Sequence, residues 1–345
     1  TPTLERLATE GAVFERAYSN ASWTRPSNAT FMTSLQHSVL GGVVHGFNVV
    51  PEEVPTMAQH LHRAGLQTSA LSTNPNIGDM SGLERGVDFL SYRVGGSEND
   101  NQSSKSMQDA FWRWREAYPG EPYWVHFQPM DIHRNFPAVA PFSGLFVGSD
   151  QWKWWEESRN RLNEEGGTRP YSGAFEATGI DRQAYFSVSQ GLYDEALAHT
   201  DHQVGRLVHR LKAEGEWENT LLIIAADHSI KAAARDLGIG LQDSLPPPWS
   251  QPIFRPSISR IPLLFVWPGH IEGGRRFQEP VVSMIDMLPT ILDLLELPPP
   301  ETMQGQSLAP LLLGEGEVES RPVILDEFDV DSETGEFRGV IEVID

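Results

Sequence analysis

The stretch Leu221-Leu222-Ile223-Ile224-Ala225-Ala226-Asp227-His228 decides the fold class of this chain. Its first six residues are apolar without alternation, and such a run is typical of a strand buried on both faces, as in parallel sheets flanked by helices. Asp227 and His228 follow the run directly. In open α/β sheets, functional sites gather where the strands reach their carboxyl ends. The stretch therefore predicts an α/β fold with a polar pair at one edge of its sheet.

Strands and helices alternate on both sides of this stretch. The patterns predict strands over residues 67–72, 123–127 and 262–266, and helices over residues 55–64, 106–117, 181–214 and 284–295. Alternation over this length predicts one α/β sandwich, residues 1–345, with a mostly parallel central sheet flanked by helices. Residues 134–180 and 236–260 carry little periodicity, and we expect both to be long loop excursions.

The composition excludes several classes of protein. Of the 345 residues, 47 are Asp or Glu and 26 are Lys or Arg, so the formal net charge is −21. A surface this acidic repels nucleic acid, and no apolar run approaches the ~20 residues that cross a bilayer. Because cysteine is absent, disulfides, thiolate metal sites and a cysteine nucleophile are excluded. The expected partner is a small molecule, while the oligomeric state and the compartment stay open.

The ends of the chain suggest an internal fragment. Thr1 leads directly into helical sequence, and residues 343–345 stop inside strand-like sequence. A domain rarely starts with no lead-in. We therefore expect a catalytic domain that lacks its N-terminal strand and its C-terminal part.

A first candidate for chemistry is Thr24, in the turn Trp23-Thr24-Arg25-Pro26-Ser27-Asn28. The turn precedes a predicted helix, whose free N–H groups and dipole would hold an anionic ester. A threonine hydroxyl is a poor nucleophile unless a metal lowers its pKa. The alternative is that the turn merely caps a helix.

The second candidate is the pair Asp227 and His228 at the end of the apolar run. A carboxylate beside an imidazole suits a divalent cation, and calcium, magnesium, manganese and zinc all remain possible. One or two such ions are expected. The alternative is a helix cap followed by an incidental histidine.

The third candidate is the segment 126–133, just beyond the predicted strand 123–127. Asp131 and His133 lie two residues apart, so in an extended loop their side chains would point the same way. Together with His126 they could bind a substrate anion, bind a metal or protonate a leaving group. The alternative is one ion pair that stabilises the loop. We expect His199 to be a surface residue of a helix.

Segments in the same order along the chain carry a resemblance to a known family. They are residues 1–11, 14–20, 22–35, 125–133, 193–211 with Asp201, 223–228, 282–290 and 304–308. Together they resemble the sulfatase family of the alkaline-phosphatase superfamily. The resemblance implies an α/β sandwich that hydrolyses sulfate or phosphate esters with a divalent metal.

The resemblance also implies a role for each candidate residue. Thr24 takes the nucleophile position and is a metal ligand, as in the branch of the superfamily whose threonine hydroxyl attacks directly. Asp227 and His228 bind the metal. His133 acts on the transferred group or the leaving oxygen, and three residues contact the substrate: Asn28, His126 and Asp131.

Several features depart from the family's pattern, and two concern the expected substrate contacts. Asn28 stands where an arginine is usual, and residues 72–76 resemble the family's lysine-and-histidine substrate segment without either residue. Two other functions therefore stay open: an anion-binding protein with eroded chemistry on the same fold, and a phosphotransferase or mutase of the superfamily.

Overall fold

The computed structural model describes residues 1–21, 23–41, 50–74, 76–77, 81–91, 103–133, 139–166, 172–228, 259–330 and 337–344. The helices are α1 (Pro2–Glu10), α2 (Thr24–Thr33), α3 (Met57–Arg63), α4 (Ser103–Ala117), α5 (Ser149–Gly166), α6 (Ser172–Thr178), α7 (Arg182–Ala213), α10 (Met287–Leu294) and α11 (Ala309–Leu313). The strands are β1 (Ala12–Phe14), β2 (Ala17–Tyr18), β3 (Gln67–Ser72), β4 (Phe89–Ser91), β5 (Tyr123–Gln128), β6 (Leu222–Ala225), β7 (Arg260–Ile261), β8 (Leu263–Val266), β9 (Arg275–Phe277), β10 (Val282–Ser283), β11 (Val323–Val330) and β12 (Phe337–Ile344).

The fold is the predicted α/β type, but its sheets are mixed. The described strands are ordered β6-β8-β1-β9, β4-β3-β5 and β10-β2-β7, beside a β11-β12 hairpin. Four of the strand pairings are parallel and four are antiparallel. The expectation of a mostly parallel sheet is therefore wrong, because an apolar run reports burial and not the direction of the neighbouring strands. β6 itself is half-buried and ends its described sheet.

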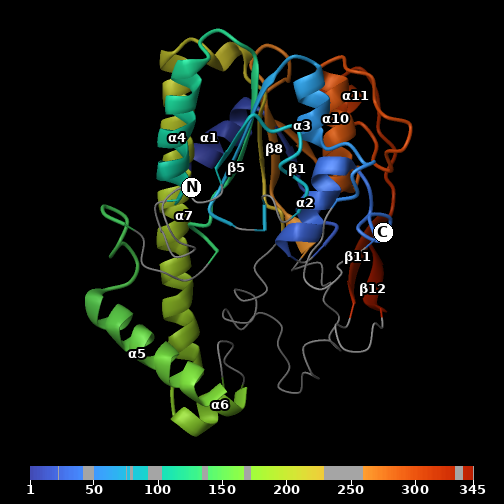
Figure 1. Cartoon of the computed structure of the whole chain (residues 1–345). Coiled ribbons are helices and arrows are strands. Elements are labelled where there is room, and N and C mark those ends of the chain that lie inside the picture. Colours follow the sequence, from blue (N-terminus) through green and yellow to red (C-terminus); the bar gives the residue numbers. More distant parts are fainter. Residues whose placement is uncertain are drawn as a thin grey trace.

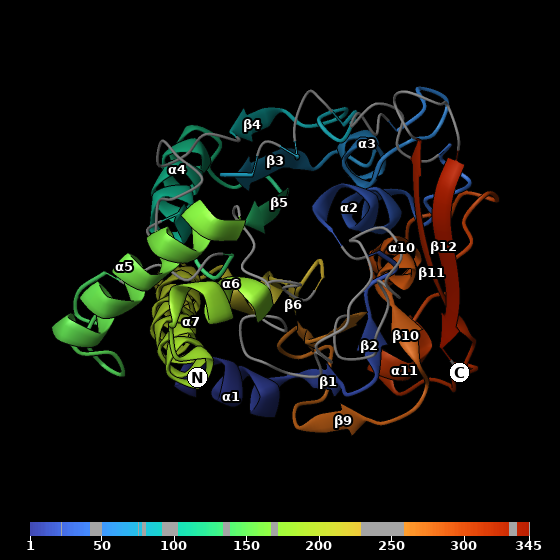
Figure 2. The ribbon, with the colours of Figure 1, turned by 90° about the horizontal axis from the view of Figure 1, so that it is seen from below.

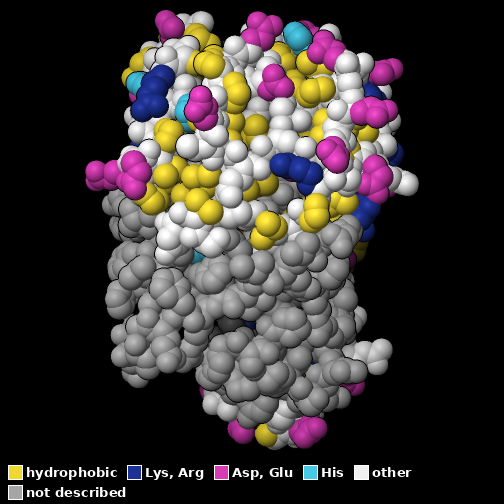
Figure 3. Space-filling view, turned by 90° about the vertical axis from the view of Figure 1, so that its right-hand side faces the viewer, with side chains coloured by type: hydrophobic (Ala, Val, Ile, Leu, Met, Phe, Trp, Pro, Cys, Tyr) yellow, Lys and Arg dark blue, Asp and Glu magenta, His cyan; other side chains and the backbone are white. Residues whose placement is uncertain are grey.

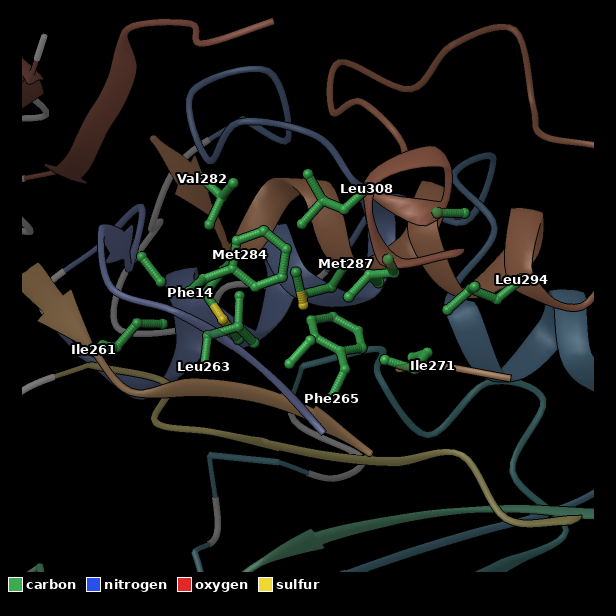
Figure 4. Packing of buried hydrophobic residues seen from close by; sticks show 14 residues of the cluster. Phe14, Ile261, Leu263, Phe265, Ile271, Val282, Met284, Met287, Leu294 and Leu308 are labelled. Carbon is green, nitrogen blue, oxygen red and sulfur yellow. The ribbon is translucent and has the colours of Figure 1, made fainter. Parts of the chain in front are cut away.

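Helices cover the strands from two sides. α1, α4 and α7 lie together on one side, and α2, α3, α10 and α11 gather on the other (Figure 1, Figure 2). The first group buries Leu7 and Phe111 against the strands. On the other side, Phe14, Phe265 and Met287 share one cluster (Figure 4). Each fully buried side chain of this size contributes about 1.5–3 kcal/mol, so these two apolar layers hold the strand edges in place.

Residues 134–180 were expected to be a loop excursion, and the structure corrects this. α5 and α6 fall inside that range and pack on the N-terminal part of α7. Their apolar cluster includes Trp155, Leu162 and Tyr185, and the Trp155 indole donates to Ser189 Oγ at 2.7 Å. α5 is otherwise strongly polar, so its few apolar positions give no clear period along the sequence. The other expected excursion, 236–260, lies outside the described residues except for its last two.

The surface is acidic, as the composition requires. Figure 3 shows Asp and Glu side chains spread over the described part of one face, with Lys and Arg between them. Among the described residues, no helix is long and apolar enough to cross a membrane.

The N-terminus of α1 is capped by a residue from far along the chain. Asp201 of α7 accepts hydrogen bonds from the backbone N–H of Thr3 at 3.0 Å and of Leu4 at 2.8 Å. These are two of the four N–H groups that a helix start leaves without a partner. The Asp201 side chain is buried, so it pins α1 to α7 where water cannot replace it.

We predict that Asp201→Ala lowers the free energy of unfolding by about 2 kcal/mol or more, because two buried N–H groups lose their acceptor. Asp194→Ala is the matched control, since Asp194 lies on the same helix and binds only the Gln190 side chain. Urea unfolding of both variants measures the difference. Equal losses in the two variants would show that the cap contributes nothing specific.

Candidate functional site

Four segments meet at one edge of the fold, which we call the rim: the carboxyl ends of β3, β5 and β6 and the start of α2. β3 and β5 are parallel, and their last residues, Ser72 and Gln128, are register partners. Ser72 Oγ donates to the Gln128 carbonyl at 3.3 Å. The sequence predicted a site at strand ends, and the rim brings Thr24, Asn28, Asp227 and His228 together there.

Thr24 is the first residue of α2 and is only 5% exposed. Its Oγ1 lies 3.2 Å from Asn74 Nδ2 and 3.3 Å from His228 Nε2. No histidine lies close to Thr24 in the sequence, but the structure places His228, which is 204 residues away along the chain, within hydrogen-bond distance.

Asp227 receives neutral donors from three segments. Gln128 Nε2 lies 2.9 Å and Asn28 Nδ2 3.5 Å from its Oδ2, and the backbone N–H of His228 donates to Oδ1 at 3.0 Å. His228 Nε2 lies 3.5 Å from the same Oδ2. Ser27 Oγ donates to the Asp227 carbonyl and so ties α2 to the end of β6.

The donor set at this point is chemically suited to a divalent cation. The Asp227 carboxylate, the His228 imidazole and the Thr24 hydroxyl are linked through His228, which lies within hydrogen-bond or ion-pair distance of both others. Carboxylate and hydroxyl oxygens suit hard ions, and the imidazole admits zinc or manganese. Among the described residues, no group of three or more His, Cys, Asp or Glu side chains converges. The three groups named here are fewer than a calcium or magnesium site commonly collects.

Asn28 was predicted to contact substrate, and its amide has a different use in the structure. Its Nδ2 donates to the Thr24 carbonyl at 2.9 Å and faces Asp227. The side chain is 1% exposed. Asn28 thus links the first turn of α2 to Asp227. Its contact with substrate stays a prediction.

His126 lies on β5, two residues before Gln128 at the rim. Its ring stacks on Trp124 and is tilted against Phe31, and its Nε2 contacts Gln128 Oε1 at 3.2 Å. Desolvation lowers the pKa of His126 to about 4, against the opposing effects of the Gln128 hydrogen bond and the Asp227 charge. The neutral ring donates to Gln128, which in turn donates to Asp227. The contact of His126 with substrate stays a prediction; the contacts in the structure link its ring to Asp227 through Gln128.

Asp131 is also buried. Its carboxylate accepts from Ser103 Oγ, from the Ser104 backbone N–H at 2.9 Å and from Ser104 Oγ at 2.8 Å, at the start of α4. His199 Nδ1 of α7 lies 3.3 Å from it. His199 is buried, so its prediction as a surface residue is wrong.

The extended loop expected around Asp131 is a turn. The His133 backbone N–H donates to the Met130 carbonyl at 3.0 Å. In a turn, residues two apart need not point to the same side, so the argument that Asp131 and His133 face the same way does not hold. The catalytic role of His133 stays a prediction, with its residue placed in the turn that follows β5.

Arg25 and the amides of residues 74, 76 and 128 were missed by the sequence reasoning. Arg25 is buried, its Nε donates to Asn76 Oδ1 at 2.7 Å, and desolvation lowers its pKa. Neutral amides carry no charge or metal signature in a sequence. Their only signal was position, because Asn74 follows β3 and Gln128 ends β5.

The chain resembles known sulfatases over most of its length. An arylsulfatase of Clostridium perfringens is 20% identical over 375 residues, which cover 90% of this chain and 73% of that protein. An ulvan-active sulfatase of Formosa agariphila is 23% identical over 363 residues, or 96% of this chain. The chain spans about half of that second relative, 54% of its length.

Solved structures agree with the fold. The phosphonate monoester hydrolase of Agrobacterium radiobacter superposes with a TM-score of 0.72 at 18% identity, covering 100% of this chain and 81% of that one. A protein solved in complex with its substrate D-glucosamine-2-N,6-O-disulfate gives a TM-score of 0.71 at 17% identity, covering 99% and 82%. Both likenesses establish an alkaline-phosphatase-like fold. The sequence profile of the sulfatase family matches residues 1–297, and the chain belongs to the sulfatase family.

Proposed function

We propose that this chain is the core of a divalent-metal-dependent hydrolase of sulfate or phosphate esters, with Thr24 as its nucleophile. The observation that carries the proposal is the meeting of Thr24 Oγ1, His228 Nε2 and Asp227 Oδ2 at the rim. A hydroxyl beside a carboxylate and an imidazole, at a helix start and at strand ends, is suited to transfer of an anionic group. Sulfatases and phosphonate monoester hydrolases among the similar proteins support both ester classes.

The reaction runs through a covalent intermediate. The oxygen of Thr24 bonds to the sulfur or phosphorus of the ester as the bond to the leaving oxygen breaks. The threonine hydroxyl gives up its proton to solvent, and the leaving oxygen takes one, for which His133 in the turn after β5 is the candidate donor. Water then attacks the same sulfur or phosphorus and gives a proton back to His133, while the bond to the Thr24 oxygen breaks. That oxygen takes a proton from solvent, so sulfate or phosphate is freed and the hydroxyl is restored. The first N–H groups of α2 lie beside Thr24 and favour the anionic group.

Asp227, His228 and Thr24 would hold the cation. Members of the sulfatase family generally use a divalent metal ion. When bound, such an ion supplies Lewis-acid stabilisation of charge on the transferred group. The residues of this chain keep the ligands aligned: Gln128 and Asn28 donate to Asp227 without cancelling its charge, because both amides are neutral.

We predict that Thr24→Ala lowers kcat of the full-length protein by at least about 10³-fold, because the attacking oxygen is lost. Thr24→Ser should keep a measurable rate, since the hydroxyl survives. Thr33→Ala is the matched control: Thr33 is a buried threonine of the same helix whose hydroxyl binds only the backbone of residues 29 and 35. The assay uses aryl sulfate, phosphate monoester and phosphate diester substrates with each of calcium, magnesium, manganese and zinc.

Two outcomes of that assay would contradict the proposal. If Thr24→Ala hydrolyses the best substrate as fast as the parent, Thr24 is only a helix residue. If the parent turns over no substrate but binds inorganic sulfate or phosphate, the chain is an anion-binding protein with eroded chemistry. Transfer to an acceptor alcohol instead of water would identify a phosphotransferase.

A second prediction concerns the metal. Asp227→Asn keeps the shape of the side chain but removes its charge, so we expect the affinity for Mn²⁺ to fall more than about 100-fold. Calorimetric titration after removal of metal with EDTA measures this, and added Mn²⁺ should restore the activity of the parent. Asp293→Asn, at an exposed acid bound to Ser307, should bind Mn²⁺ as the parent does. Unchanged affinity of Asp227→Asn would remove Asp227 from the metal site.

A third prediction concerns pH. His126 titrates at about 4 in the folded chain against an ordinary value of 6.5. The unfolded chain therefore binds a proton that the folded chain does not, and stability falls as pH drops from about 6.5 to about 4, by about 3 kcal/mol in total. His126→Phe keeps an aromatic ring and should lose this part of the pH dependence. Urea unfolding of both proteins without added metal, at pH 7.5 and 4.5, is the measurement; parallel losses would refute the assignment.

A further inference from the structure

The segment after β3 supplies a hydrogen-bond donor aimed at the Thr24 oxygen. Asn74 Nδ2 lies 3.2 Å from Thr24 Oγ1, and both side chains are buried, at 3% and 5% exposure. We propose that Asn74 is a catalytic residue, whose amide holds the Thr24 oxygen in position for attack and favours its deprotonated form. This inference rests on the proposed role of Thr24 as nucleophile.

The orientation of the Asn74 amide follows from its second partner. The backbone N–H of Asn76 donates to Asn74 Oδ1 at 3.0 Å. A backbone N–H can only donate, so the atom that faces it must be the oxygen. The amide nitrogen is thereby turned toward Thr24. A donor placed there binds an alkoxide more tightly than a hydroxyl, so it favours loss of the Thr24 proton and raises the share of the attacking form.

Two further contacts make this amide rigid. The Asn74 backbone N–H donates to Ser72 Oγ at 2.8 Å, which anchors the segment to the end of β3. On its other side, Arg25 Nε donates to Asn76 Oδ1 at 2.7 Å. Because Arg25 follows Thr24 directly, the contacts close a ring that runs from Thr24 through Asn74 and Asn76 back to Arg25. Preorganised donors of this kind need no rearrangement when charge develops.

The two asparagines have opposite uses, and this allows a matched test. Asn74 needs its nitrogen as a donor toward Thr24, whereas Asn76 uses its side-chain oxygen as an acceptor from Arg25. Replacing the amide by a carboxylate keeps the shape and the acceptor and removes the donor. Asn74→Asp should therefore fail where Asn76→Asp succeeds, although both add one negative charge to the same segment.

The experiment measures kcat and KM for the full-length protein at about pH 8 with its best ester and metal. We expect Asn74→Asp and Asn74→Ala to lower kcat by about 10²–10³-fold, because the donor that positions the attacking oxygen is lost, with KM changed by less than about 3-fold. Asn76→Asp, which keeps the acceptor for Arg25, should lower kcat by at least about 10-fold less than Asn74→Asp. Thermal unfolding of each variant checks that the fold is retained, and Asn74→Ala serves if the aspartate variant does not fold.

A readout apart from turnover comes from orthovanadate, which adds to a nucleophilic hydroxyl oxygen. Its affinity, measured by calorimetry, should fall in Asn74→Asp and persist in Asn76→Asp. The inference is overturned if folded Asn74 variants keep more than a tenth of the parent kcat, or if Asn76→Asp loses as much as Asn74→Asp. The two proposals can fail separately. If Thr24→Ala is inactive and Asn74→Ala is fully active, only the role of Asn74 is refuted. If Thr24→Ala is fully active, the roles of both residues are refuted.

Discussion

The rim depends on one constraint, which is that a carboxylate at the end of β6 must be satisfied where water is partly excluded. Asp227 meets it with donors from three segments: Gln128 of β5, Asn28 of α2 and the backbone of His228. Since a buried charge without partners is costly, these contacts fix how β5, β6 and α2 meet. The donors are neutral, so the charge remains available to a cation. Thr24 is carried into contact with His228 by the same arrangement.

Buried acids play a similar part away from the rim. Asp201 of α7 caps α1, and Glu195 of α7 accepts from the backbone N–H groups of Gly144, Phe146 and Val147. Asp131 caps α4 and contacts His199 of α7. In each case a carboxylate collects N–H or hydroxyl donors from a distant segment. α7 therefore acts as a common support for α1, for α4 and for residues 144–147.

Predictions from the sequence were correct where they depended on neighbouring residues and failed where they depended on contacts between distant segments. The strands at 123–127 and 262–266 were predicted correctly, because a mainly apolar run of strand length is a local signal. α5 was missed, since its few apolar residues gain meaning only against α7. His126 and Asp131 were assigned to the substrate because titratable residues at strand ends favour chemistry, but their directions are set by Gln128 and by the start of α4.

The sequence by itself determined the α/β class, the family and the segments that carry Thr24, Asp227 and His228, because these depend on local apolar periodicity and on motifs in a fixed order. Only the tertiary structure decided the mixed direction of the strands, the burial of Thr24 and the contacts of Asn74, Gln128 and His199. The physical reason is that a side chain's partners across the fold are chosen by packing and by the need to satisfy buried polar groups. Those choices join residues that are far apart in the chain, as in the contact of Thr24 with His228, 204 positions away.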